Sequence, residues 1–387
     1  MSIRFSAGAV AALAVVGEAG AQVPILMYHA HQNMSFSRPV FEGHMDMLVS
    51  RGFTTIDLDR FLAWHRDARP LPHRPIVITF DDNYIMGYTD VYPVLAARGM
   101  VGINYTHTRG IGIGAPKASW EQIREMEAAG VFLVESHSRT HPRLSTVSAT
   151  QLVGEVHGSR DDIAANVNGK VSRHLCYPYG DYSQAVITEA IAAGYLTATT
   201  TTAGFNTRQT PLFELLRFSG DGRTVAQLEA SLEVSRFLNP PTPGTGWVVD
   251  DEGPHASFDG AVWGTSTAPS GFVGSRQRVR PVGAGPEPFR WAVELPVEGA
   301  VVVRVRYTAA SDRSPGATYT IITPDGPQTA TLDQRSGGGA WQTLGTFEIG
   351  PDKVASVELD AASGSLSADG VWFELAPVSH PEGWLLF

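Results

Sequence analysis

Apolar and polar residues follow two rhythms along the first part of the chain. Short apolar runs, rich in β-branched residues, predict strands that are buried on both faces, as in a parallel sheet. Between these runs, apolar residues recur at helical spacing, for example at Phe41, Met45 and Leu48. Ser119 and Gln122 show the pattern of a helix-capping box. The predicted strands cover residues 23–28, 75–80, 102–105, 131–134, 171–177 and 196–201.

The alternation of strands and helices indicates an α/β domain with a parallel sheet, either a barrel or a doubly wound sheet. The rhythm changes after residues 239–246, which read NPPTPGTG and predict a linker. Beyond this segment, alternating and β-branched runs are separated by turn signals such as PDG and SGGG. This second pattern predicts an antiparallel β-sandwich.

Composition narrows the classes of protein that fit. A chain of 387 residues with 43% hydrophobic residues is long enough for two domains with buried cores, which excludes a disordered chain. The formal net charge of −10 argues against nucleic acid as a partner. The charge is uneven, because residues 239–387 hold 17 acidic against 9 basic residues. This asymmetry supports a change of domain near residue 239.

The N-terminus has the pattern of a signal peptide. Arg4 precedes a small apolar run over residues 7–16, and AGA at 19–21 is a small-x-small cleavage site. The run is too short for a membrane span, which needs about 20 apolar residues. We therefore expect a protein that is secreted or exported to the periplasm. The single cysteine, Cys176, excludes an internal disulfide.

Two groups of polar residues follow predicted strands. Asp81 and Asp82 end the strand at 75–80, and His137 and His141 come just after the strand at 131–134. Two imidazoles and one carboxylate form a three-ligand site with an open position, the pattern of catalytic zinc. The second carboxylate is then free to take a proton from water. The histidine pair alone is a weak signal, and the adjacent carboxylates strengthen it.

A third motif, CYPYG at 176–180, lies at the carboxyl end of the strand predicted at 171–177. Proline and glycine suit a simple turn. The alternative is a cleft wall in which a backbone N–H binds an oxyanion. Composition alone does not separate these two interpretations.

Together, TFDD at 79–82, HSRTH at 137–141 and YPYG at 177–180 resemble the leading motifs of the NodB-homology polysaccharide deacetylases of carbohydrate esterase family 4. The resemblance covers about residues 23–238. It implies a distorted (β/α) barrel, to be followed here by the antiparallel β-sandwich. It also implies metal-dependent removal of acetyl groups from sugars, most often N-acetyl groups, with Zn²⁺ as the expected metal.

The resemblance also implies roles for individual residues. Asp81 corresponds to the general base, and Asp82, His137 and His141 correspond to the metal ligands. Tyr179 corresponds to the residue whose backbone N–H completes the oxyanion hole. Water activated by the metal would attack the acetyl carbonyl, and acetate would be released.

Three positions depart from the family pattern. Asn83 replaces a common glycine, which is acceptable because asparagine enters left-handed backbone conformations more readily than most residues. Cys176 stands where an arginine often orients the base. Leu215-Leu216-Arg217 replaces the late Leu-x-His motif that supplies the general acid. Arginine is too basic to donate a proton, so the acid stays open, and Arg217 could instead hold Asp81 from across the barrel.

The stretch GYLTATTTTAGFN and the strand ending in MYH at 27–29 are similar to a subgroup that includes exported poly-β-1,6-N-acetylglucosamine deacetylases. His29 lies at a predicted strand end, so it could line the same cleft as general acid or as a partner of the metal ligands. A purely structural histidine is the alternative, and the sequence leaves both open.

Three stretches carry a second resemblance: VVDDEGPHASFDGAVWGTSTAPSGFVGS at 248–275, GGAWQTLGTFEIG at 338–350 and ADGVWFEL at 368–375. They make the region from Trp247 similar to the golvesin-type C-terminal domain, which accompanies extracellular polysaccharide-active enzymes. This resemblance implies attachment to a polymer or to the cell surface. The region holds six of the eight tryptophans, which we expect mainly in its core. They are Trp247, Trp263, Trp291, Trp341, Trp372 and Trp384.

The expected organisation is a signal peptide at 1–21, a deacetylase domain at 22–238, a linker at 239–246 and a β-sandwich accessory domain at 247–377. The expected function is that of an exported metal-dependent N-deacetylase whose partner is an acetylated polysaccharide. Two alternatives are an O-acetyl esterase of the xylan type and a non-catalytic glycan-binding protein. The polymer, the linkage, the native metal and the oligomeric state stay open.

Overall fold

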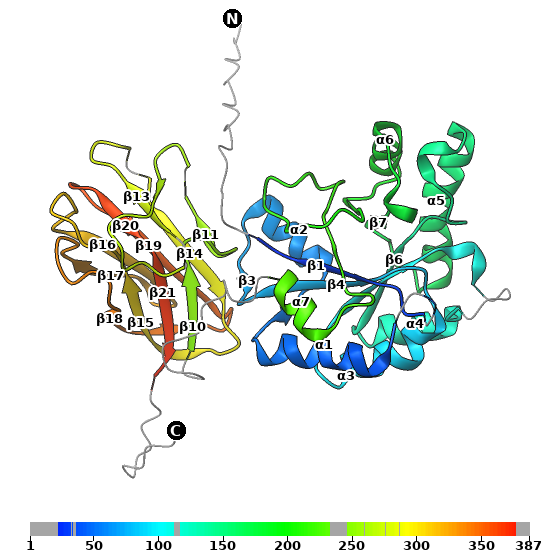
Figure 1. Ribbon diagram of the computed structural model, residues 1–387, viewed down its shortest axis with the longest axis horizontal. Helices are drawn as coiled ribbons and strands as arrows, with labels where there is room; N and C mark the ends of the chain where they lie inside the picture. The colour runs from blue at the N-terminus through cyan, green and yellow to red at the C-terminus, as the bar shows by residue number, and fades with distance from the viewer. Residues whose placement is uncertain are drawn as a thin grey trace, which may run out of the picture.

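The structure is a computed structural model that describes residues 22–31, 33, 36–111, 117–232, 246–258, 260–274, 276–285 and 287–376. Two lobes lie side by side (Figure 1). The expected signal peptide at 1–21 and the linker residues 239–245 lie outside the described residues. Gly246, which we assigned to the linker, begins a strand.

The larger lobe is built on one parallel sheet in the order β8-β7-β6-β5-β4-β1-β9, with β2 paired to β4. Helices pack outside this sheet (Figure 1). No described helix is both long and apolar enough to cross a membrane. The strands are β1 (Ile25–Tyr28), β2 (Thr54–Thr55), β4 (Pro75–Phe80), β5 (Gly102–Thr106), β6 (Phe132–Ser136), β7 (His174–Cys176), β8 (Thr197–Thr199) and β9 (Phe218–Ser219). The helices are α1 (Arg38–Ser50), α2 (Leu58–Asp67), α3 (Tyr92–Ala96), α4 (Trp120–Ala128), α5 (Ala149–Asn166), α6 (Gln184–Ala192) and α7 (Val225–Ser231).

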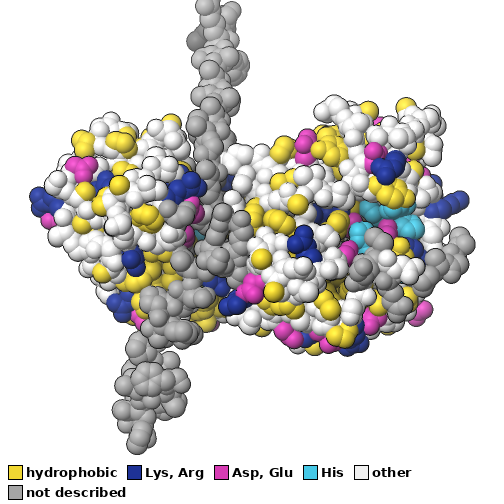
Figure 2. Space-filling view, viewed as in Figure 1, with side chains coloured by type: hydrophobic (Ala, Val, Ile, Leu, Met, Phe, Trp, Pro, Cys, Tyr) yellow, Lys and Arg dark blue, Asp and Glu magenta, His cyan; other side chains and the backbone are white. Residues whose placement is uncertain are grey.

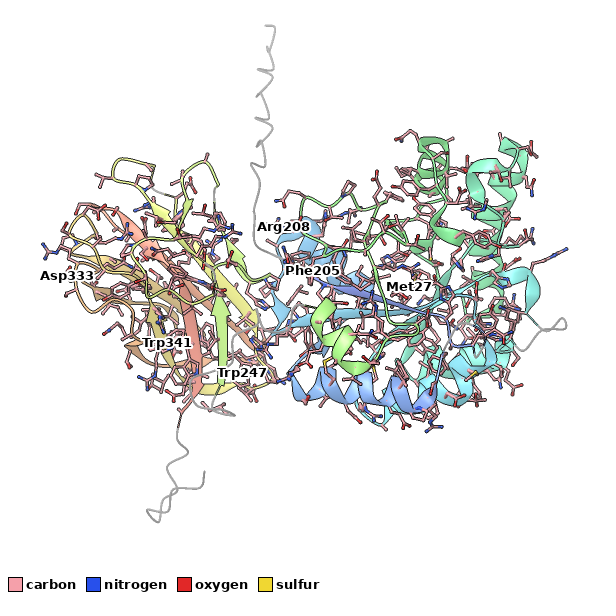
Figure 3. The ribbon with its side chains drawn as sticks, viewed as in Figure 1. Met27, Phe205, Arg208, Trp247, Asp333 and Trp341 are labelled. Carbon is pink, nitrogen blue, oxygen red and sulfur yellow. The ribbon has the colours of Figure 1, made fainter. Side chains whose placement is uncertain are left out.

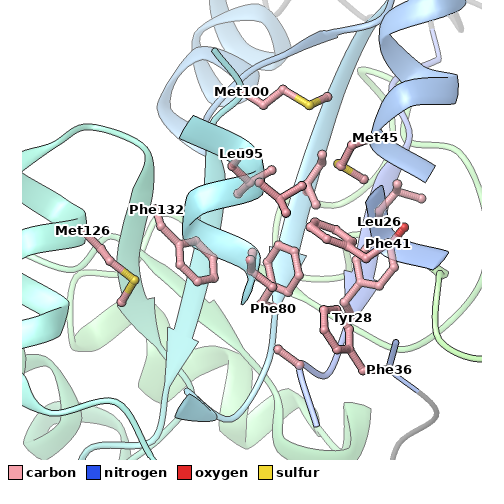
Figure 4. Close-up of a cluster of buried hydrophobic side chains, with 14 of the residues drawn as sticks. Leu26, Tyr28, Phe36, Phe41, Met45, Phe80, Leu95, Met100, Met126 and Phe132 are labelled. Carbon is pink, nitrogen blue, oxygen red and sulfur yellow. The ribbon is translucent and has the colours of Figure 1, made fainter. Parts of the chain in front are cut away.

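The strand β4 shows how the sequence specifies the two faces of the sheet. All six of its residues are buried. Ile78 and Phe80 belong to the core under the helices, where Phe80 packs against Phe132 and Tyr28 (Figure 4). Thr79 alternates with them, so it faces the inside of the barrel, and the same alternation places Asp81 on the inside.

A segment after β8 closes the barrel. Leu215 N–H donates to Ala198 O at 3.0 Å, and Thr200 N–H donates to Leu215 O at 2.8 Å. The chain then enters β9, which pairs with β1. Residues 212–219 therefore connect the two edges of the sheet and complete a distorted barrel, as the family resemblance implied.

The six predicted strands are β1 and β4 to β8, most of them shortened by one or more residues at an end. The predicted capping box at Ser119 and Gln122 begins α4. The apolar spacing did not predict α5, although α5 is the longest described helix of this lobe. Its apolar stripe is interrupted by the buried Glu155 and Ser159, which weakens the helical periodicity.

The smaller lobe is an antiparallel sandwich with no helix among its described residues, as predicted. Val249, Trp291, Val303 and Phe373 belong to its core. Three of the tryptophans, Trp263, Trp291 and Trp372, are buried, whereas Trp247 and Trp341 (Figure 3) are half-buried. Trp384 lies outside the described residues. The strands are β10 (Gly246–Asp250), β11 (Ala256–Ser257), β12 (Gly264–Ser266), β13 (Gln277–Arg280), β14 (Phe289–Glu294), β15 (Gly299–Arg306), β16 (Ala317–Thr323), β17 (Gly326–Leu332), β18 (Gln342–Ile349), β19 (Val354–Asp360), β20 (Leu366–Ala368) and β21 (Gly370–Leu375).

The two lobes share a strand. The short β3 (Leu71–Pro72) comes from the larger lobe but pairs in parallel with β14 of the smaller one. Arg60 forms an ion pair with Glu294 beside this strand. The buried indole N–H of Trp64 donates to Pro254 O at 3.0 Å. Sheet pairing, an ion pair and a buried hydrogen bond therefore join the lobes.

Two histidines stack at the same contact. The rings of His73 and His255 lie 6.3 Å apart and are tilted by 15°, and His73 Nε2 donates to Val248 O at 3.1 Å. Among the described residues, neither ring nitrogen of His255 has a hydrogen-bond partner. Burial lowers the pKa of His255 to about 3 and that of His73 to about 4.

We predict that acid pH weakens this contact. An unfolded histidine titrates near pH 6.5, and the folded protein keeps both rings neutral. Their contribution to stability is therefore complete above about pH 6.5 and is lost progressively as the pH falls toward the folded-state values. Between pH 7 and pH 4, the free energy of unfolding should fall by about 2 kcal/mol more for the wild type than for His255→Phe. Chemical denaturation at both pH values measures this, and equal losses in the two proteins would contradict it.

Candidate active site

The carboxyl ends of β4, β6 and β7 lie at one edge of the parallel sheet, and the three motifs follow these strand ends. Parallel strands all end at the same edge, so residues distant in sequence meet there. On the face drawn in Figure 2, histidine side chains gather on the larger lobe beside acidic ones.

Asp82, His137 and His141 converge on one point. Asp82 Oδ1 lies 3.1 Å from His141 Nε2 and 3.6 Å from His137 Nε2, and the two nitrogens lie 3.2 Å apart. The Nδ1–H of His137 donates to Cys176 O at 2.8 Å, which leaves Nε2 as the lone-pair nitrogen. Two imidazole nitrogens and a carboxylate oxygen within 4.8 Å of one another suit a divalent metal of the zinc type.

The charge states of these groups also fit metal binding. Burial lowers the pKa of His137 to about 4, so its ring is neutral at physiological pH. Burial alone would raise the pKa of Asp82, but His141 and His137 keep that pKa below its ordinary value. Metal ligands must be deprotonated, and at neutral pH both residues meet this requirement.

The backbone around this point is strained. Nine described residues other than glycine have positive φ, of which four lie in the three motifs and a fifth, Asn83, directly follows the first motif. Such conformations cost of order 1–3 kcal/mol each and gather at functional sites. Asn83 adopts the left-handed conformation that the sequence predicted, with φ of 54°. The five residues are Asp82, Asn83, Ser138, His141 and Tyr179.

Buried polar groups hold the strained loops in place. Asn83 donates to Ala118 O at 3.0 Å and accepts from Asn104 at 2.9 Å. Glu155 of α5 accepts the backbone N–H groups of Arg139 and Thr140 at 3.0 and 2.7 Å. These bonds explain why a carboxylate interrupts the apolar face of α5.

Arg217 holds Asp81 through two hydrogen bonds. The guanidinium donates from Nη1 to Oδ1 and from Nη2 to Oδ2 of Asp81, each at 2.8 Å. Arg217 is 1% exposed, and it also donates to Thr200 O at 2.7 Å and to Thr79 Oγ1 at 3.0 Å. The structure therefore places Arg217 where the alternative role, holding Asp81 from across the barrel, requires it.

Cys176 makes room for this arrangement. Its small thiol lies 3.1 Å from Nη2 of Arg217 and 3.4 Å from Oδ2 of Asp81. The guanidinium thus reaches Asp81 from the barrel-closing segment, past the position where the family often has an arginine. Burial raises the pKa of Asp81, but Arg217 and His137 outweigh it and lower that pKa to about 2. Asp81 is therefore ionised at physiological pH.

His29 lies on the other side of Asp81, with its Nε2 3.9 Å from Oδ2. Asp221 holds the ring, because its carboxylate accepts from His29 Nδ1 at 2.8 Å and from the His29 backbone N–H. Burial lowers the pKa of His29, but Asp221 and Asp81 raise it by more, so its pKa lies above the ordinary value. Asp221 was not predicted from the sequence, because it follows β9, a strand of two residues that is too short to show periodicity.

The rim of the site is aromatic and basic. Tyr179 is 56% exposed, and its ring lies 4.6 Å from that of His141. His107, to which the sequence analysis gave no role in the site, lies 5.5 Å from His141. Lys117 Nζ lies 3.7 Å from the ring centre of Tyr84 and donates to Asp82 O at 2.7 Å. All seven predicted site residues thus occupy one edge of the barrel.

Comparison with known families gives two matches. Residues 68–198 match the polysaccharide deacetylase family, and residues 247–375 match the golvesin C-terminal domain. YxkH of Bacillus subtilis, which carries the name of a polysaccharide deacetylase, is 30% identical over 204 residues that span 52% of this chain and 72% of YxkH. The poly-β-1,6-N-acetyl-D-glucosamine N-deacetylase of Escherichia coli K12 is 27% identical over 24% of this chain and 16% of its own length.

Solved structures share the fold of the larger lobe. The Streptococcus pyogenes deacetylase PplD, in complex with acetate, superposes with a TM-score of 0.52 and 22% identity over 55% of this chain and 99% of PplD. IcaB from Ammonifex degensii superposes with a TM-score of 0.50 and 21% identity over 55% of this chain and 97% of IcaB.

The convergent ligand atoms predict that His141→Ala weakens zinc binding by at least about 100-fold, since one of three protein ligands is lost. Chelator-treated full-length protein would be titrated with Zn²⁺ by calorimetry. His157→Ala is the matched control, because His157 is paired only with Glu189 at the surface in the described contacts. Equal zinc affinity in the wild type and His141→Ala would refute the ligand assignment.

Proposed function

The chain belongs to the polysaccharide deacetylase family, and from this premise we propose that it is an exported metal-dependent hydrolase of N-acetylated polysaccharides. One observation carries the proposal. An ionised carboxylate, Asp81, is held rigidly between the convergent Asp82–His137–His141 group and a histidine with a raised pKa. This arrangement provides a base, a metal site and an acid around one point.

The base would be Asp81. Its two hydrogen bonds to Arg217 fix the plane of the carboxylate and keep it ionised. A general base must be held within reach of the proton that it takes. Arg217 acts through Asp81, so we assign it as a positioning residue. A divalent metal at Asp82, His137 and His141, which we propose to be Zn²⁺, would activate the attacking water and polarise the acetyl carbonyl.

The acid would be His29. An amide leaves as an amine only if its nitrogen gains a proton, so the reaction needs a protonated donor. Asp221 favours the charged ring and orients it, with Nε2 directed to the Asp81 side. The proton donor would then come from the end of β1, in place of the missing Leu-x-His motif.

Tyr179 would supply the oxyanion donor through its backbone N–H. It lies in the tight turn Pro178–Gly180, with φ of 60° and its ring against His141. A donor fixed by the backbone needs no reorganisation as negative charge develops on the acetyl oxygen. The positive φ supports a specialised turn over a simple one.

The substrate class rests on the acid. An O-acetyl ester has a better leaving group, so its hydrolysis depends less on protonation. The Asp221–His29 pair therefore favours an N-acetyl substrate over the O-acetyl esterase alternative. The name of the Escherichia coli relative supports a polymer of N-acetylglucosamine. The chain keeps the proposed base and all three proposed metal ligands, which argues against a non-catalytic glycan-binding protein.

Export and attachment complete the proposal. The signal-peptide pattern at 1–21 supports a secreted or periplasmic protein. The match to the golvesin domain at 247–375 supports attachment of the smaller lobe to a polymer or cell surface. We propose domain boundaries at 22–238 and 247–377, with residues 239–246 between them.

The proposal predicts that Asp81→Asn lowers acetate release by at least about 1000-fold, because an amide cannot accept the proton. Zinc-loaded protein would be assayed for acetate from N-acetylglucosamine oligomers, with and without a chelator. Asp161→Asn, at an exposed position on α5, is the matched control. If zinc-loaded wild type releases no acetate from N-acetylated or O-acetylated glycans, the proposed activity is wrong.

A second prediction separates the acid from the rest of the site. His29→Gln should lower hydrolysis of N-acetylglucosamine oligomers by at least about 100-fold, because the amine then leaves unprotonated. Hydrolysis of 4-nitrophenyl acetate should fall less than about 10-fold, since its leaving group needs no proton. Equal losses on the amide and on the activated ester would contradict the acid role of His29.

A further inference from the structure

Three carboxylates meet in the smaller lobe, far along the chain from the proposed active site. Asp250 ends β10, Asp251 follows it, and Asp369 lies just before β21. One oxygen from each lies within 4.8 Å of the others. Asp251 and Asp369 are 0% exposed. Water therefore does not solvate these two charges.

The carboxylate of Asp251 lacks hydrogen bonds. Neither of its oxygens accepts one from the described residues. The Nε of Arg278 lies 3.5 Å from Oδ2, which is longer than the 2.7–2.9 Å of a charge-assisted hydrogen bond. A buried carboxylate that accepts no hydrogen bond is costly even when an ion pair lies nearby. The two open oxygens of Asp251 therefore indicate a cation inside the cluster.

The other two carboxylates are held toward the same point. Both oxygens of Asp369 accept the Val273 N–H, at 2.8 and 2.9 Å. Gly274 has φ of +71°, and a Cβ at this position would lie 2.7 Å from Asp250 Oδ2. The loop at 271–274 therefore closes over the cluster, and three segments distant in sequence build it.

Two arginines form only long ion pairs with the cluster. Arg278 Nε lies 3.5 Å from Asp251 Oδ2, and Arg306 Nε lies 3.9 Å from Asp369 Oδ2 while it donates to Gly271 O. All the atoms of this cluster that could bind a metal ion are carboxylate oxygens, because the group contains no histidine or cysteine. Hard cations such as Ca²⁺ prefer such donors, whereas zinc prefers nitrogen and sulfur.

We propose that Asp250, Asp251 and Asp369 bind one calcium ion, at a site separate from the proposed zinc site of the larger lobe. Ca²⁺ fits better than Mg²⁺ because it takes several protein oxygens in irregular geometry and gives up its water more readily. The ion would bind the carboxylate of Asp251, whose oxygens accept no hydrogen bond from the described residues. Glu252, paired with Arg276, lies at the edge of the site.

The site also bears on the contact between the lobes. Asp251 is followed within four residues by Pro254, whose carbonyl accepts from Trp64, and by His255, which stacks on His73. A calcium ion would fix the start of this turn. Calcium should therefore stabilise the sandwich and the turn that contacts the larger lobe.

The test uses full-length protein stripped with EGTA. Calorimetric titration with CaCl₂ should give one site per chain, and 5 mM CaCl₂ should raise the melting temperature by about 5 °C or more. MgCl₂ at the same concentration should raise it less. Asp251→Asn and Asp369→Asn should each weaken calcium binding by at least about 10-fold and remove the thermal shift.

Two controls separate this site from others. Asp325→Asn makes the same change at an exposed hairpin position of the same lobe and should bind calcium like the wild type. His141→Ala, in the proposed zinc site, should also retain calcium binding. The proposal is wrong if the wild type binds no calcium, or if His141→Ala abolishes calcium binding. The wild type and His141→Ala therefore test the proposal even if the aspartate variants do not fold.

A shared-proton cluster is the competing solution. In that case Asp251→Asn would raise the melting temperature in EGTA, and calcium would change neither protein. That result would overturn the calcium site without touching the proposed deacetylase activity.

Discussion

The buried ion pair between Asp81 and Arg217 is the interaction on which the larger lobe depends. Two charges removed from water are costly unless each finds its hydrogen-bond partners. Arg217 meets this condition with Asp81, Thr79 and Thr200, and it can do so only when residues 212–219 have closed the barrel. Closure of the fold and orientation of the proposed base are therefore the same event.

The same barrel stores strain where the proposed chemistry takes place. Asp82, His141 and Tyr179 have backbone conformations that most residues avoid, and they lie in loops that follow buried strands. Buried groups such as Asn104 and Glu155 hold these loops. The stability of the apolar core thus compensates for a preorganised polar edge.

The smaller lobe is joined to this barrel by more than a chain connection. Strand β3 extends its sheet, Trp64 donates to its backbone, and the His73–His255 stack lies beside the turn that begins at Asp251. The contact between the lobes thus depends on two buried histidines that are neutral at physiological pH and on a turn that the proposed calcium ion would fix. The proposed attachment to a polymer would therefore present the active site in a defined orientation.

Local patterns were enough to predict the strands, their carboxyl ends and the group formed by Asp81, Asp82, His137 and His141. Alternation reports which residues are buried on a strand, and all parallel strands end at one edge. The left-handed conformation of Asn83 agrees with its position at a common glycine of the family pattern. Asp221 beside His29 could not be predicted in this way, Arg217 beside Asp81 was expected only as one alternative from the family resemblance, and Asp369 beside Asp251 could not be predicted. These partners lie 192, 136 and 118 residues apart, and only the path of the folded chain brings them together.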